Sequence, residues 1–145
     1  MKKITLLLLI SVFAAFAAAC GSGTTSTTGD TAAGKTVKSG PAGNNLTATL
    51  SSKDGVLRKG KQDFTLTFTD AAGKPVDVGS VSLNFHMPAM GTMAVMNNPA
   101  TFTTTSTPGV YAGKTDLEMS GEWQAQIKYE GPAGSGSANL PIVAQ

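Results

Sequence analysis

Methionine sulfur is the chemically distinctive group that this sequence concentrates in one place. Residues 86–96 read HMPAMGTMAVM and hold four of the five methionines that follow the N-terminal segment. They are Met87, Met90, Met93 and Met96, spaced by three, and the only histidine, His86, precedes the first. Thioether sulfur is a soft ligand that favours Cu(I) and has no proton to lose on binding. Pro88 and Gly91 should turn the stretch out of its strand into a loop. A loop with sulfur at every third residue can direct two or three sulfur atoms toward one point, and His86 can add a nitrogen, so these five side chains are the predicted copper ligands.

A second interpretation of the same stretch needs no metal. Met87 is in phase with Val81, Leu83 and Phe85, so strand alternation assigns it to a buried face. Methionine fills irregular gaps, and a methionine cluster can plug the open end of a core. His86 is out of phase with these residues and is expected to face away from the core. The residues alone leave both interpretations open.

Enzymatic chemistry finds little support in the rest of the chain. The single cysteine excludes an internal disulfide and a cysteine-only metal cluster, and the single histidine excludes any site with two imidazoles. A Ser-His-Asp arrangement would depend wholly on His86. The carboxylates of the C-terminal half show no spacing that pairs two of them around a cleft. We therefore expect a protein that is not an enzyme.

The charge balance argues against nucleic acid as a partner. The 145 residues carry 11 Lys and Arg against 9 Asp and Glu. Two of the lysines, Lys2 and Lys3, lie in a segment that is expected to be removed, which leaves equal numbers of basic and acidic side chains. A neutral body lacks the basic surface that binds phosphate backbones.

The N-terminus has the layout of an export signal. Lys2 and Lys3 precede an apolar stretch over residues 4–19 that ends in three alanines directly before Cys20. Sixteen residues are fewer than the roughly 20 that span a bilayer as a helix. The layout predicts a signal peptide over residues 1–19. Its end resembles a bacterial lipobox, although Ala17 stands where leucine is usual, and the resemblance implies that Cys20 is lipidated.

Lipidation would place the protein outside the cytoplasm with its acyl chains in a bacterial membrane. The residue after the cysteine is Gly21 rather than an aspartate. This favours the outer membrane in a Gram-negative cell, and in a Gram-positive cell the anchor is the outer face of the plasma membrane. Cleavage near Ala19 without lipidation is the alternative and would leave a free thiol.

A flexible linker is predicted between Cys20 and residue 45. Gly, Ser or Thr occupies 15 of the 25 positions from Gly21 to Asn45, and Val37 is the one large aliphatic residue among them. Such a composition buries too little apolar surface to offset the entropy of ordering. The folded domain is accordingly expected to cover residues 46–145.

Residues 46–145 show the period of two that is typical of half-buried strands. Turn residues separate the runs, and no window sustains a helical pattern. About seven antiparallel strands in a hundred residues predict an all-β, immunoglobulin-like sandwich, with Trp123, Phe64, Phe68 and Phe85 at the centre of its core. The predicted strands are residues 46–52, 64–69, 81–87, 101–106, 110–117, 123–129 and 135–143.

Several short motifs within this region resemble the YtkA-like domain family, which is related to FixH proteins and recurs beside copper-efflux adaptor subunits. They are AGKPV at residues 72–76, VSLNF at 81–85, MPAM at 87–90, GVYA at 109–112 and MSGEW at 119–123. The resemblance implies an extracytoplasmic β-sandwich with roles in copper handling or cytochrome oxidase assembly. The motif methionines correspond to Met87 and Met90. Many members carry a histidine just after the Met-Gly pair, where this chain has Thr92.

These observations lead to two functional hypotheses. The first is a lipid-anchored accessory protein that binds or handles copper, as Cu(I), through the methionine-rich stretch. The second is an interaction module that needs no metal and docks a respiratory oxidase or an efflux-pump subunit through the same residues, since methionine suits adaptable protein contacts.

Overall fold

The computed structural model describes residues 34–145, and the predicted signal peptide, Cys20 and the first part of the predicted linker lie outside them. Within the described residues the structure is all-β and contains no helix. The strands are β1 Lys35–Gly43, β2 Leu46–Ser52, β3 Gly60–Thr69, β4 Ser80–Met87, β5 Met96–Pro99, β6 Thr101–Thr104, β7 Val110–Leu117, β8 Gly121–Gly131 and β9 Gly134–Ala144.

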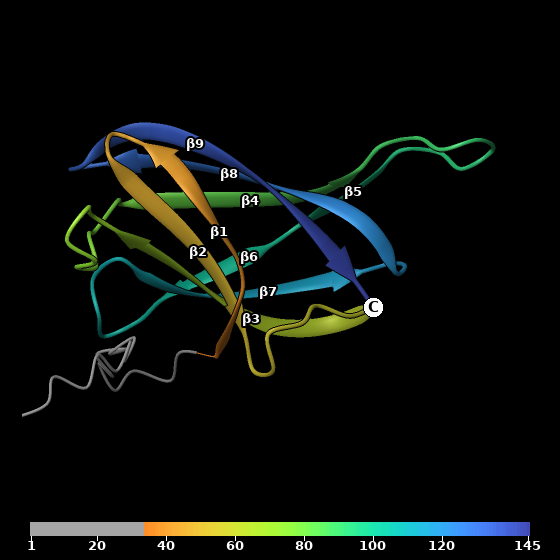
Figure 1. Ribbon diagram of the computed structural model, residues 1–145, viewed down its shortest axis with the longest axis horizontal. Helices are drawn as coiled ribbons and strands as arrows, with labels where there is room; N and C mark the ends of the chain where they lie inside the picture. Colours follow the sequence, from red (N-terminus) through yellow and green to blue (C-terminus); the bar gives the residue numbers. More distant parts are fainter. Residues whose placement is uncertain (1–33) are drawn as a thin grey trace, which may run out of the picture.

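The strands form two antiparallel sheets that pack face to face (Figure 1). One sheet has the order β1-β2-β3-β7-β6 and the other has the order β5-β4-β8-β9. The predicted β-sandwich is therefore confirmed, and each of the seven predicted strands is present, some with slightly different ends. Two strands, β1 and β5, were not predicted.

The first of these, β1, corrects the predicted boundary between linker and domain. It lies within the stretch assigned to a flexible linker, and that prediction is wrong from Lys35 onward, because Lys35–Gly43 pairs along β2. Most of its side chains are exposed, so the strand lacks the apolar alternation that reveals a strand in sequence. Backbone hydrogen bonds and close packing stabilise it instead: Ala42 is fully buried, and a Cβ atom at Gly40 would lie 2.6 Å from Leu140 of β9.

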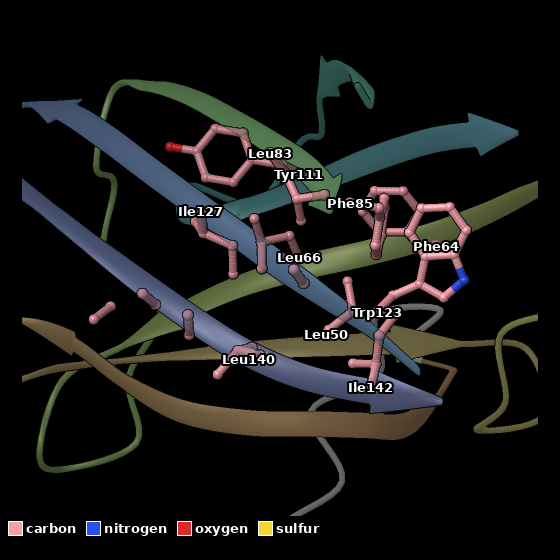
Figure 2. Close-up of a cluster of buried hydrophobic side chains, with 14 of the residues drawn as sticks. Leu50, Phe64, Leu66, Leu83, Phe85, Tyr111, Trp123, Ile127, Leu140 and Ile142 are labelled. Atoms are coloured by element: carbon pink, nitrogen blue, oxygen red, sulfur yellow. The ribbon is translucent and has the colours of Figure 1, made fainter. Parts of the chain in front are cut away.

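The core lies between the two sheets and is centred on aromatic side chains (Figure 2). Phe64 of one sheet meets Phe85 of the other edge to face, with ring centroids 5.8 Å apart. Trp123 and Phe68 are also buried, as alternation predicted. Aromatic pairs of this geometry stabilise a fold by more than the apolar area that they bury. This cluster therefore fixes how the two sheets face each other, and it also positions the ends of β4 and β8.

Among residues 34–145, no helix has the length and apolar character needed to cross a membrane.

Candidate functional site

The methionine-rich stretch forms a hairpin between β4 and β5. β4 ends at Met87 and β5 begins at Met96, and Figure 1 shows the connection between them projecting beyond the rest of the molecule, in green. The sequence predicted a loop here, and the structure corrects this in part. Met87 pairs with Met96, and farther out Met90 pairs with Met93 in the same register as an isolated bridge.

The tip of this hairpin brings two predicted ligands together. The backbone N–H of Met90 donates to the carbonyl of Met93 over 3.2 Å, and the N–H of Met93 donates to the carbonyl of Met90 over 2.9 Å. Gly91, in the turn, has a φ of 58°, which glycine adopts without strain. Residues that exchange both backbone hydrogen bonds are direct cross-strand neighbours whose side chains leave the ribbon on one face. The two sulfur-bearing side chains therefore start from adjacent positions on the same side, and Met90 is 48% exposed.

The second methionine pair, at the base of the hairpin, points inward. Met87 is only 1% exposed and lies opposite Met96, which packs against the core from a partly buried position. The Met87 methyl group comes within 3.2 Å of where a Cβ atom would stand on Gly121. The strand phase of Met87 is thus confirmed, and this residue is a core side chain.

His86 lies on the opposite face of β4 from Met87. Its Nδ1 is 3.0 Å from Oδ1 of Asn97, which also accepts a hydrogen bond from Asn84. Met90 lies beyond the end of β4, four residues after His86, which corresponds to about 13 Å at the rise per residue of extended chain. The five predicted ligands therefore lie at three levels of the hairpin, and the structure pairs Met90 with Met93 and Met87 with Met96.

The fifth methionine lies in another part of the chain. Met119, in the turn between β7 and β8, packs partly buried against the core, and its carbonyl accepts a hydrogen bond from the indole N–H of Trp123 over 3.1 Å. Its place among the core methionines was missed because Met119 is isolated in sequence. The signal that could have indicated it is its place four residues before Trp123, whose strand phase predicted burial.

Oxygen and nitrogen ligands do not gather in the described part of the chain. No group of three or more His, Cys, Asp or Glu side chains within residues 34–145 is placed to hold a metal ion. Methionine sulfur, by contrast, is paired at the tip of the hairpin, and this donor selects soft cations such as Cu(I).

A shallow groove of about 570 Å³ runs from the hairpin to the end of β9. Pro88 and Met90 line one part of it, and Trp123, Ile142 and Val143 line another. Val143 is 60% exposed. Exposed apolar side chains that share one groove are typical of a contact surface.

The fold and the projecting hairpin together define a small β-sandwich domain that presents methionine at one end. The sequence model of the YtkA-like family matches residues 42–128, which cover most of the sandwich and the whole hairpin. The chain belongs to the YtkA-like family. Searches of curated proteins and of solved structures found no match to the chain.

Proposed function

We propose that this YtkA-like protein is a lipid-anchored, extracytoplasmic accessory protein that binds or handles copper and catalyses no reaction. The observation that carries the proposal is the cross-strand pair of Met90 and Met93 at the exposed tip of the hairpin. Two thioethers on adjacent positions of one face are already close to each other before a soft metal ion binds. Such preorganisation reduces the conformational entropy that is lost on binding.

The geometry assigns different roles to the five predicted ligands. Met90 and Met93 are the central ligands in this proposal, and Met96 or His86 are additional ligands only if the hairpin twists to bring them closer. Met87 contributes to the core. A site with two thioethers at an exposed tip leaves coordination positions open, which suits a protein that passes Cu(I) to another carrier.

The anchoring part of the proposal depends on the N-terminal sequence. Residues 1–19 have the layout of a signal peptide, and Cys20 is the only cysteine of the chain. With lipidation, the folded domain would be tethered to a membrane surface.

A Cu(I) competition titration tests the copper proposal. The double variant Met90→Leu/Met93→Leu removes both sulfur atoms and keeps volume and hydrophobicity, a change that usually costs less than about 1.5 kcal/mol. We expect the variant to lose Cu(I) affinity and to keep the wild-type melting temperature. Met119→Leu is the matched control, because it removes one sulfur away from the tip. Equal competition against a Cu(I) chelator by wild type and double variant would overturn the proposal.

Zinc binding provides a second comparison with the same protein. Zn(II) prefers thiolate, imidazole and carboxylate ligands, so wild type should bind Zn(II) poorly. Strong Zn(II) binding that survives the double variant would point to a different site.

Docking of a respiratory oxidase or efflux-pump subunit is the second candidate function. The groove beside the hairpin supports it, since Met90 and Val143 are both exposed and both line it. The two functions respond differently to substitution. Leucine at positions 90 and 93 keeps an apolar docking surface and removes copper ligands, whereas Val143→Glu changes the groove and keeps every sulfur atom.

A further inference from the structure

The methionines of this domain differ sharply in their access to solvent. Met90 is 48% exposed, Met93, Met96 and Met119 are partly buried, and Met87 is 1% exposed. Oxidation of methionine to the sulfoxide follows access to the sulfur atom. The exposure alone therefore ranks Met90 first and Met87 last.

The surroundings of Met90 allow the oxidised side chain without loss of the fold. The two hydrogen bonds that close the tip, between Met90 and Met93, use only backbone atoms. The tip also has open space around it, because a Cβ atom built on Gly91 would meet nothing within 4 Å. Met90 itself is 48% exposed, so an oxygen atom added to its side chain meets solvent rather than a packed core.

Oxidation at Met87 would have the opposite effect. Its side chain is packed in the core against the start of β8, where a Cβ atom on Gly121 would already lie 3.2 Å from the Met87 methyl. A polar sulfoxide there would place an oxygen atom in apolar surroundings, which is unfavourable without a hydrogen-bond partner. The fold therefore separates a modifiable methionine at the tip from a protected methionine at the base.

We propose that Met90 is a site of reversible oxidation by hydroperoxides. The sulfur attacks one peroxide oxygen, an S–O bond forms as the O–O bond breaks, and the peroxide leaves as water or an alcohol. Sulfur loses two electrons and the peroxide gains them. A methionine sulfoxide reductase returns the side chain to the thioether: two thiols supply two electrons and two protons, the sulfoxide oxygen leaves as water, and the thiols form a disulfide.

The oxidation changes what the tip can bind. A sulfoxide is polar and no longer offers the soft thioether donor that selects Cu(I). This consequence rests on the proposed copper function, whereas the order in which the methionines oxidise does not.

The test treats the full chain with hydrogen peroxide and follows each methionine by peptide mass spectrometry. No Lys or Arg lies between Lys74 and Lys114, so trypsin leaves Met87, Met90, Met93 and Met96 in one peptide. Fragment ions must separate these four, and Met119 falls in the next peptide. We expect Met90 to oxidise roughly tenfold or more faster than Met87, in keeping with their difference in exposure.

Two further measurements make the result decisive. Met90→Leu should slow the total oxidation of that peptide and leave the rate at Met87 unchanged. Protein oxidised only at Met90 should keep its melting temperature, and treatment with the reductase should restore its mass. Oxidation of Met87 or Met119 as fast as Met90, or unfolding upon oxidation of Met90 alone, would overturn the proposal.

The copper titration then separates the two proposals. Loss of Cu(I) affinity on oxidation, with recovery after reduction, supports both. If wild type binds no Cu(I) while Met90 still oxidises first, the copper function fails and the modification site stands.

Discussion

Met87 and Met96 lie directly opposite each other at the base of the β4–β5 hairpin, on the face that covers the core. Met90 and Met93 repeat this pairing at the tip, where Met90 is exposed. One hairpin register thus carries a structural pair of methionines and a solvent-accessible pair. Met87 and Met96 are nine residues apart in sequence and Met90 and Met93 are three apart, so the second pair lies at the turn, farther from the core.

Alanine substitutions at Met87 and Met90 should separate these roles. Met87→Ala should lower the free energy of unfolding by about 2–5 kcal/mol, because it leaves a cavity in a packed core. Met90→Ala should change it by no more than about 0.5 kcal/mol, as is usual for a surface position. Urea denaturation followed by Trp fluorescence measures both. Similar losses for the two variants would contradict the assignment of Met87 to the core.

Sequence alternation was sufficient to predict most of the sandwich. Phe64, Phe85 and Trp123 sit on strands whose apolar residues recur at every second position, so their burial could be read directly. β5 has no such signal: its four residues include two asparagines and a proline, and Asn98 is buried through a hydrogen bond to the carbonyl of Asp116. A buried asparagine is stabilised by a partner distant in sequence, which periodicity does not reveal.

The sequence predicted which residue types make up the candidate site, but it predicted their arrangement in space only in part. The spacing of the methionines identified the ligand type and marked Met87 as a core residue. It did not show that Met90 and Met93 pair across a turn, because that pairing depends on the register inherited from β4 and β5. Nor did it predict that Met119 packs against the core, since Met119 is isolated in sequence.

Tyr111 should make the stability of the domain depend on alkaline pH. Its hydroxyl donates to Oδ1 of Asp77 over 3.1 Å and accepts from the N–H of Val78 over 3.2 Å. Burial raises the pKa of this hydroxyl above its ordinary value; the Val78 hydrogen bond opposes the rise and the Asp77 carboxylate adds to it. The folded state therefore holds this proton more tightly than the unfolded chain does.

The sign of the effect follows from this difference in pKa. The stabilisation is fully present below the unfolded pKa near 10 and is lost as pH rises through the folded pKa. Denaturant midpoints measured between about pH 8 and 11 should fall more steeply for wild type than for Tyr111→Phe. The phenylalanine variant also loses the two hydrogen bonds of the hydroxyl, so its midpoint should be lower throughout and the slopes are compared. It retains the lysines, and parallel curves would show that Tyr111 has no part in the pH dependence.

Cys20→Ser should release the protein from membranes if the cysteine carries the lipid anchor. Hydrophobic attachment through acyl chains resists salt, so wild type should stay in the membrane fraction after a high-salt wash while the variant becomes soluble. The described fold begins at residue 34, and the released variant should keep the wild-type melting temperature. Wild-type protein with an unmodified cysteine by mass spectrometry would contradict the anchor.

Shortening the chain from its N-terminus tests the contribution of β1. A chain that starts at Gly34 keeps every described strand, whereas a chain that starts at Leu46 loses β1 and its pairing with β2. Without β1, Ala42 no longer packs in the core and Leu140 loses the close approach of Gly40. We expect the shorter chain to lose at least about 2 kcal/mol in free energy of unfolding, well beyond the range of a surface change. Thermal unfolding of the two chains measures the difference, and equal melting temperatures would mean that β1 is dispensable and that the stable domain begins near Leu46.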